Sequence, residues 1–193
     1  MTPQFVGFDG ETSVNLQCLS CAGENVGYVV MLSRLNAIGA KIESFYWADD
    51  LACWVDDQNY EPLKGITFQP GEAFWLDGDS EKQILRSSGQ VSKTDAIIQL
   101  CDGATMTGNF TPIDIDLQDV VCEGKNVGYT VMLSKLDSIG VKTQSYYWAD
   151  DLACWVDDQN YEYVSGVKIA AGEGVWIDGN NSEQYVIFPG VEL

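Results

Sequence analysis

Short runs of β-branched and aromatic residues, separated by turns rich in glycine and aspartate, make up most of the chain. Apolar and polar side chains alternate in several of these runs, as they do in strands that bury one face. In the first half, the pattern predicts strands at Lys41–Trp47, Ala52–Val55, Ile66–Phe68 and Ala73–Leu76. The second half repeats these four segments, and a longer strand is predicted between the halves at Ala96–Cys101. We therefore expect an all-β protein.

One segment, Gly27–Leu35, fits two patterns. Alternate apolar residues favour a strand, whereas a second set of apolar positions would line a helix that ends at Gly39. Two adjacent β-branched residues, Val29 and Val30, favour the strand because branching at Cβ restricts the side chain in a helix. The segment is thus predicted to form a hairpin that turns near Asn36–Gly39.

The second half repeats the first at a constant offset of 101 residues, so that Asn25–Glu61 returns as Asn126–Glu162. A period of this length matches a small domain and is too long for a solenoid repeat. This internal duplication predicts two similar sandwich- or barrel-like modules that pack as a pseudo-symmetric pair. The expected units are residues 1–92 as the first module, 93–110 as a structured connector strand, and 111–193 as the second module.

The composition excludes several classes of function. With 46% hydrophobic residues, the 193-residue chain can bury a core and fold as a globular protein. Its formal net charge of −19 repels phosphates and anionic headgroups, so we expect neither a nucleic-acid partner nor insertion into a membrane. The chain has no histidine, which is the usual general base near neutral pH. We therefore expect that the protein is not an enzyme.

The six cysteines sort into pairs under the repeat. Four of them match between the copies, and two have no counterpart. The simplest connectivity is Cys21–Cys53, Cys122–Cys154 and Cys18–Cys101. Such disulfides would indicate an oxidising compartment, which means an extracellular or cell-surface location. Free, buried cysteines in a cytosolic protein are the alternative.

Aspartate pairs flank a Cys-Trp dipeptide in both copies. They are Asp49, Asp50, Asp56 and Asp57 in the first copy, and Asp150, Asp151, Asp157 and Asp158 in the second. Calcium is bound by about six to eight oxygens of this kind, so calcium is a possible cofactor and the only one that the sequence suggests. The ligand order of an EF-hand is missing, and solvated turns are the alternative explanation.

The same region contains the most similar part of the two copies, because every residue from Tyr46 to Glu61 is identical to its counterpart. Its tryptophans are Trp47, Trp54, Trp148 and Trp155. Exposed indoles beside aspartates are typical of sugar-binding surfaces, which makes a glycan a possible ligand. The alternative is a tryptophan-rich core, since each indole buries a large area.

The connector has no counterpart after the second copy, so one strand position is unmatched. An unfilled position leaves a sheet edge open, and open edges pair with other chains unless they are covered. The N-terminal segment Met1–Val14 can fill the position within its own chain or in a neighbour. Self-association is therefore expected, and the residues proposed to take part in it are Phe5, Val6, Phe8, Ile97 and Ile98.

Two phrases, GNFTPIDIDLQDV at Gly108–Val120 and GEGVWIDG at Gly172–Gly179, resemble those of tandem-repeat β-domain proteins predicted to be secreted by bacteria. The resemblance extends over most of both copies. It implies an extracellular β-repeat protein, and it transfers no activity and no site residue. Together the observations predict an extracellular structural or self-assembling subunit of a surface layer, filament or particle, associating through sheet edges. A non-catalytic glycan-binding adhesin is the alternative.

Overall fold

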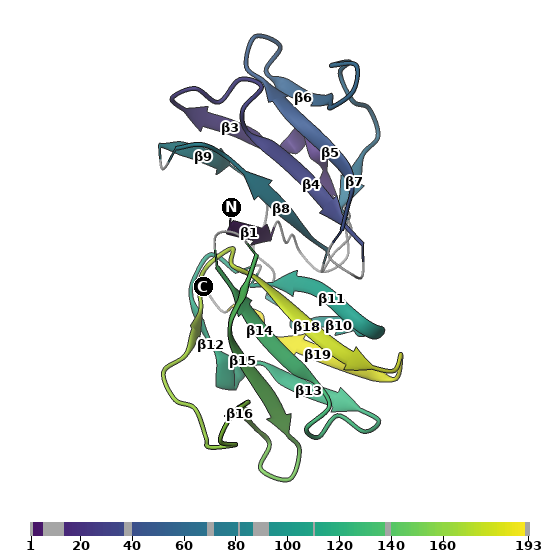
Figure 1. The fold of residues 1–193 in the computed structure, drawn as a ribbon, viewed down its shortest axis with the longest axis vertical. Coiled ribbons are helices and arrows are strands. Elements are labelled where there is room, and N and C mark those ends of the chain that lie inside the picture. Colours follow the sequence, from purple (N-terminus) through teal and green to yellow (C-terminus); the bar gives the residue numbers. More distant parts are fainter. Residues whose placement is uncertain are drawn as a thin grey trace.

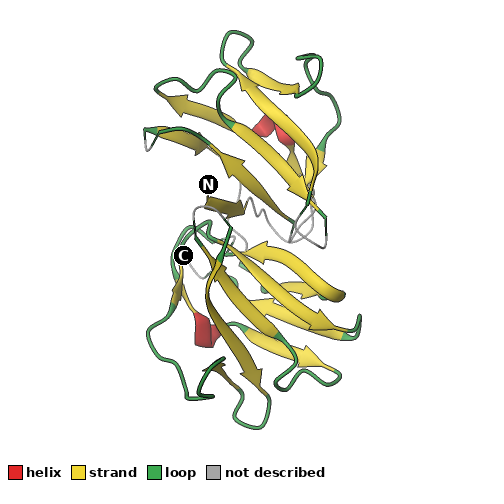
Figure 2. Cartoon of the chain, viewed as in Figure 1, coloured by secondary structure: helices red, strands yellow, loops and turns green. Residues whose placement is uncertain are grey.

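The computed structural model describes residues 2–5, 14–36, 40–68, 72–80, 82–86, 93–109, 111–137 and 140–191. Within these ranges the protein is all-β, as predicted, and its strands form several separate sheets (Figure 2). The helical content of the described residues is two short 3-10 turns, η1 (Leu16–Cys18) and η2 (Leu117–Asp119). Every strand pairing is antiparallel.

A five-stranded sheet forms the larger layer of the first half of the chain (Figure 1). In spatial order its strands are β1 (Thr2–Phe5), β8 (Ala73–Asp77), β4 (Met31–Leu35), β5 (Lys41–Ala48) and β6 (Cys53–Asp56). Burial alternates along β5, where Phe45 and Trp47 are buried and Ser44 and Tyr46 are partly exposed. The sheet therefore has one face on the core and one face toward solvent.

The second half contains a five-stranded sheet of the same order. Its strands are β11 (Asp102–Gly108), β18 (Gly174–Asn180), β14 (Met132–Leu136), β15 (Lys142–Ala149) and β16 (Cys154–Asp157). The register of the β4–β5 pair shifts between Arg34 and Leu35, and the β14–β15 pair shifts between Lys135 and Leu136. The same irregularity thus occurs at matching positions of the two sheets.

Smaller sheets form the opposite layer of each half. In the first half the pairs are β2 (Val14–Asn15) with β7 (Thr67–Phe68), and β3 (Ser20–Gly23) with β9 (Gln83–Arg86). In the second half β12 (Ile115–Asp116) pairs with β17 (Lys168–Ile169), and a three-stranded sheet has the order β10 (Ala96–Gln99), β19 (Gln184–Phe188), β13 (Val121–Gly124). Within the part of the chain that the structure describes, the halves therefore differ in one strand, β10.

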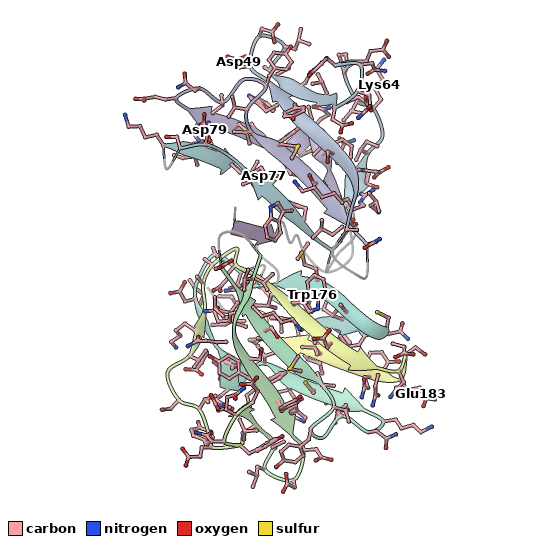
Figure 3. The ribbon with its side chains drawn as sticks, viewed as in Figure 1. Asp49, Lys64, Asp77, Asp79, Trp176 and Glu183 are labelled. Carbon is pink, nitrogen blue, oxygen red and sulfur yellow. The ribbon has the colours of Figure 1, made fainter. Side chains whose placement is uncertain are left out.

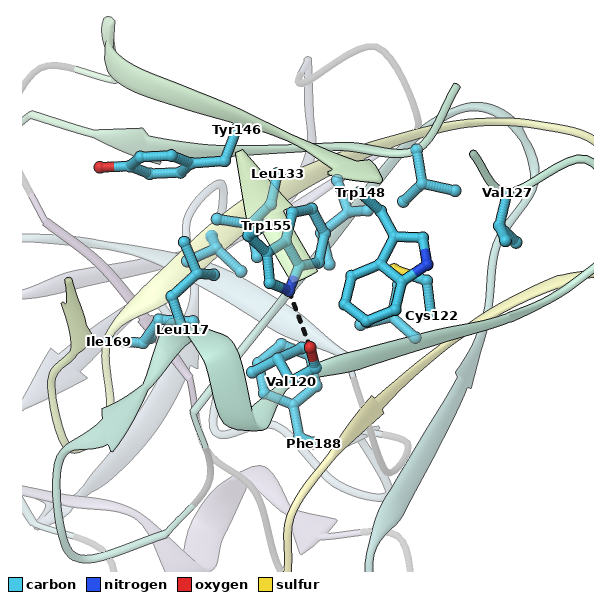
Figure 4. Close-up of a cluster of buried hydrophobic side chains, with 14 of the residues drawn as sticks. Leu117, Val120, Cys122, Val127, Leu133, Tyr146, Trp148, Trp155, Ile169 and Phe188 are labelled. Atoms are coloured by element: carbon cyan, nitrogen blue, oxygen red, sulfur yellow. Dashed lines mark hydrogen bonds between the residues drawn. The ribbon is translucent and has the colours of Figure 1, made fainter. Parts of the chain in front are cut away.

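Each half encloses its own hydrophobic core between the two layers. A tryptophan lies at the centre of each, and both Trp54 and Trp155 are fully buried. The indole of Trp155 donates a 2.7 Å hydrogen bond to the carbonyl of Val120 (Figure 4), and Trp54 donates a 3.0 Å bond to Leu19. The polar atom of each ring is satisfied, so the ring contributes its full apolar area to the core.

The two halves lie one above the other along the long axis of the molecule (Figure 1). Strand β1 contacts β18, and β8 contacts β11. At this seam the ring of Trp75 approaches Gly140 so closely that a Cβ atom at Gly140 would overlap it. Gly140 also has a φ of +82°, which favours glycine. Glycine is therefore required there both for backbone conformation and for space.

Several predicted elements differ from the observed ones. In Gly27–Leu35 the strand begins only at Met31, because the preceding residues form a turn in which Val30 donates to the carbonyl of Val26. The turn predicted near Asn36–Gly39 lies mostly outside the described residues. The predicted connector region holds β10 and β11, and both pair with strands of the second half.

Candidate functional site

The segment that is identical in both copies forms the hairpin between β5 and β6 and, in the second half, the hairpin between β15 and β16. These hairpins lie at opposite ends of the molecule, far from the seam between the halves (Figure 1). Asp49 marks the end of the first half in Figure 3. The molecule therefore presents the same local sequence twice, facing in two directions.

The four tryptophans predicted to bind sugar are buried. Trp47 pairs across the hairpin with Trp54, and their rings meet edge to face at 5.6 Å; Trp148 and Trp155 repeat the arrangement at 5.5 Å. None of the four offers a ring face to solvent, so the prediction that these indoles stack on a glycan is corrected. They face inward because Trp47 and Trp54 occupy the core-facing phase of their strands, and Tyr46 occupies the outward phase.

A glutamine that the sequence analysis missed holds each hairpin onto its 3-10 turn. Gln17 donates from Nε2 to the carbonyls of Trp54 and Leu63, and its Oε1 accepts from the backbone N–H of Trp54. Gln118 makes the same three bonds in the second half, at 2.7–2.9 Å. The sequence carries a signal for this role, since Leu-Gln recurs at the repeat offset in a segment where most neighbouring residues differ.

Four of the eight aspartates organise turns through their carboxylates. Asp56 accepts hydrogen bonds from the backbone N–H groups of Gln58 and Asn59, and Asp157 repeats both contacts. Asp49 and Asp150 accept from the backbone of the next residue. Within the described ranges, no three carboxylates or thiols come together as a metal site. The calcium hypothesis therefore gains no support, and the local bonds explain why aspartate occupies these turns.

Three tyrosines in each half form an exposed ring cluster, which we call the tyrosine cluster. It consists of Tyr28, Tyr46 and Tyr60 in the first half, and of Tyr129, Tyr147 and Tyr161 in the second. Tyr60 is central in the first half, where it meets Tyr28 edge to face at 5.6 Å and stacks on Tyr46 at 6.2 Å. Tyr161 is central in the second half, where the corresponding distances are 5.9 and 6.1 Å. Sequence reasoning did not find this cluster, because its members come from one strand and two separate turns of each half.

The backbone of the tyrosine cluster is strained. Tyr28 and Tyr60 have φ angles of 56° and 58°, and their counterparts Tyr129 and Tyr161 have 54° and 58°. A bulky residue in the left-handed region costs roughly 1–2 kcal/mol. Tertiary hydrogen bonds maintain the conformation, since Tyr28 donates to the carbonyl of Trp47 at 2.6 Å. Residues held in this conformation cluster at functional sites, which makes the tyrosine cluster a candidate site.

Carboxylates surround the cluster. Tyr28 donates its hydroxyl to Asp50 at 2.9 Å, and Tyr129 donates to Asp151 at 3.1 Å. The hydrogen bond to Asp50 is the main cause that raises the pKa of Tyr28 above its ordinary value, and desolvation followed by the bond to Asp151 raises the pKa of Tyr129. Both hydroxyls therefore keep their protons at neutral pH.

The disulfide prediction is corrected, because all six cysteines are free. Cys21 lies on β3 opposite Leu85, whereas Cys53 lies on β6 opposite Ala48, so the two thiols belong to different sheets. Their counterparts Cys122 and Cys154 are separated in the same way, on β13 and β16. Cys101, proposed to pair with Cys18, instead contacts the carbonyl of Ala104 and the hydroxyl of Thr105. Two cysteines that both recur in the second copy need not lie near each other within one copy.

The unmatched strand also lies elsewhere than expected. β10 pairs with β19 of the second half, and β1 fills a place in its own chain by pairing with β8. Within the described residues, β9 has one strand neighbour, β3, whereas its counterpart β19 lies between β10 and β13. The open edge is therefore β9 of the first half, and the sequence-based placement in the second copy is wrong.

The residues proposed for assembly divide into three groups. Phe5 lies in β1 with its backbone opposite Ala73, while Val6 and Phe8 are outside the described residues. Ile98 packs against the core of the second half, and Ile97 points outward with 65% of its surface exposed. Of the two side chains in this set that the structure describes, that of Ile97 is available for contact.

Comparison with models of known protein families, with curated proteins and with solved structures finds no match to the chain. Among the described residues, no helix has the length and apolar character needed to cross a bilayer.

Proposed function

We propose that the protein is a non-catalytic structural subunit that assembles head to tail, with β10 of one copy pairing with the open edge of β9 in the next. The single observation that carries the proposal is the difference between two equivalent strands. β19 has neighbours on both sides, and β9 has one within the described part of the chain. Backbone groups at an open edge are a template for a strand of another chain.

The core of the first half is less well covered at β9, which has no second strand neighbour among the described residues. Val186 and Gln184 are fully buried beneath β10, whereas their counterparts Leu85 and Gln83 are only partly buried. Cys122 is likewise buried where Cys21 is partly exposed. A strand added to β9 would lie directly beside Leu85 and Gln83, which gives the proposed contact an apolar component in addition to backbone pairing.

The direction of the backbone groups suits a shared strand. Leu100 donates its N–H to the carbonyl of Gln184, so the N–H groups of Leu100 and, by alternation, Ile98 face β19. The N–H groups of Ile97 and Gln99 then face the opposite edge of β10. A neighbour's β9 can pair there without disturbing the β10–β19 pair, and the three-stranded sheet would continue as β13-β19-β10 followed by β9 and β3 of the next copy.

Such a contact is heterologous, because each copy contributes a different edge. Heterologous contacts that do not close into a ring generate filaments. Four paired residues offer about four backbone hydrogen bonds of roughly 0.5–1.5 kcal/mol each, which is comparable to the cost of association. The exposed side chains of Ile84 and Ile97, 51% and 65% accessible, would add apolar contact on the outer face. Assembly should therefore depend steeply on protein concentration.

The repeat and the location form two further parts of the proposal. We infer that the halves arose by duplication and pack as a pseudo-symmetric pair, since the seam contacts β1–β18 and β8–β11 exchange under the repeat. An extracellular location is supported by the resemblance to secreted bacterial repeat proteins. The glycan alternative has lost the exposed indoles on which it depended.

The test is to block the outer edge of β10 without disturbing its inner edge. Ile97→Pro removes an outward-facing N–H, and proline is tolerated on edge strands. Ile97→Thr is the matched control, because it keeps both the N–H and the branched side chain. Light scattering and electron microscopy across a concentration series should show filaments for the intact chain and the threonine variant, and monomers for the proline variant.

Circular dichroism and thermal melts establish that the proline variant is folded. The proposal fails if the intact chain remains monomeric at millimolar concentration, or if the proline variant assembles as readily as the intact chain.

A further inference from the structure

The tyrosine clusters lie at the two ends of the molecule and belong to sheets that the β10–β9 contact does not use. We propose that each tyrosine cluster binds a cationic side chain of a protein partner, lysine or arginine, and that the chain therefore carries two equivalent binding sites facing opposite directions. The inference is independent of assembly through sheet edges.

The aromatic surface of each tyrosine cluster is accessible. Tyr60 and Tyr161, the central rings, are 52% and 56% exposed, although each contacts two other rings. Leu51 and Leu152, which lie in the adjoining hairpin turns, are also exposed. Tyr60 and Tyr161 also have a left-handed backbone, and an exposed aromatic group on such a backbone costs stability. The same exposure in both halves indicates that it is a property of the site and not of one surface.

The surroundings of each tyrosine cluster are acidic. No lysine or arginine occurs from Ile42 to Leu63, or from Thr143 to Val167. The eight aspartates of these hairpins form no salt bridge with any described residue. The exposed carboxylates of Glu61 and Glu162 add to this charge. The potential at each end of the molecule is therefore negative, which attracts a cation and repels an acidic partner.

The aromatic rings and the carboxylates lie side by side in each cluster. A cation over a tyrosine face gains about 0.5–1 kcal/mol at an exposed site, and a nearby carboxylate adds an ion pair. Asp50 is fixed beside the ring of Tyr28 by their hydrogen bond, as Asp151 is beside Tyr129. A neutral sugar would use the rings and could donate hydroxyl hydrogen bonds to the carboxylate, but it would not neutralise the carboxylate charge. The observed pairing of ring and carboxylate therefore favours a cationic group.

The probe is a pentapeptide of alternating glycine and lysine, compared with the same peptide after acetylation of both lysines. Titrations followed by the NMR signals of the tyrosine rings, at a protein concentration where the chain is monomeric, should give two equivalent sites. Acetylation should abolish binding. Binding of the acetylated peptide with equal affinity, or of neither peptide, would overturn the proposal, as would binding of a neutral oligosaccharide in their place.

Substitutions separate a specific site from general attraction to an acidic protein. Tyr60→Leu leaves the net charge unchanged and should weaken binding at one end by about two- to five-fold, the equivalent of a lost cation–π contact. The double variant with Tyr161→Leu should lose that affinity at both ends. Tyr163→Leu is the control, because Tyr163 is exposed but is not a member of the cluster. Equal affinities for all three variants and the intact chain would mean that only diffuse charge is involved, and the proposal would be wrong.

Discussion

The strained backbone of the tyrosine cluster makes a quantitative prediction at Tyr161. Its φ of 58° costs any non-glycine residue roughly 1–2 kcal/mol, while its two ring contacts contribute about 0.5–1.5 kcal/mol each. Tyr161→Ala removes the ring contacts and keeps the strain, so it should destabilise the second half by about 1–3 kcal/mol. Tyr161→Gly removes both, because glycine adopts this conformation without steric cost. The glycine variant should therefore be more stable than the alanine variant by about 1 kcal/mol.

The same pair of substitutions at Tyr163 provides the control. Tyr163 is exposed, pairs as an isolated bridge with Val156 and has no positive φ. The Tyr163→Gly variant should be less stable than the Tyr163→Ala variant by roughly 0.5–1 kcal/mol, since glycine loses more conformational entropy on folding. Urea midpoints and melting temperatures measure both differences; 1 kcal/mol corresponds to roughly 2–4 °C for a chain of this size. If the order of the two variants is the same at both positions, Tyr161 does not have a left-handed backbone and the argument from strain is refuted.

Three further results are expected. Gln118→Leu leaves the N–H and carbonyl of Trp155 without their partner and should cost about 1–3 kcal/mol in urea unfolding, while a change below 0.5 kcal/mol, a rough limit, would show that water replaces the amide. Burial raises the pKa of Cys122, so a thiol reagent at pH 7 should modify exposed Cys18 first and Cys122 only on unfolding. Detection of fewer than six thiols in denatured, unreduced protein would contradict the assignment of six free cysteines. The backbone hydrogen bond from Gln118 lowers the pKa of Asp116. The carboxylate's contribution to stability is therefore complete above pH ~4 and is lost as pH falls through the folded pKa. Asp116→Asn should flatten the dependence of stability on pH in this range, which chemical unfolding at about pH 2–6 can check.

The strands could be predicted because alternation is a local property. Lys41–Trp47 was expected and Lys41–Ala48 is observed, and the prediction of Ala73–Leu76 is short by a single residue. The face that each residue occupies was less accessible. Tyr46 and Trp47 are adjacent aromatic residues, so either could have been the buried one, and only the packing of the hairpin against η1 assigns the indole to the core.

The sites depended on contacts between distant segments, and these the sequence did not reveal. Tyr28 and Tyr60 are 32 positions apart and meet because two left-handed turns direct their rings to the same place. A tyrosine in that conformation has no characteristic sequence pattern, unlike glycine or asparagine. The disulfide prediction failed for a related reason: symmetry of Cys21 and Cys53 under the repeat says nothing about whether they share a sheet.

The two proposals together predict how the molecule would behave in an assembly. The β9 edge belongs to the smaller sheet of the first half, whereas Tyr60 lies in the turn that follows β6 of the larger sheet. Pairing through β9 and β10 would therefore leave the tyrosine clusters exposed along a filament, two for each copy. Linked sites gain in apparent affinity when a partner can contact several at once. A partner with repeated lysines should consequently bind the filament more tightly than the Ile97→Pro monomer, whereas the two-lysine peptide should bind both alike. Equal affinity of a long cationic chain for filament and monomer would show that assembly and recognition are not coupled, even if each occurs.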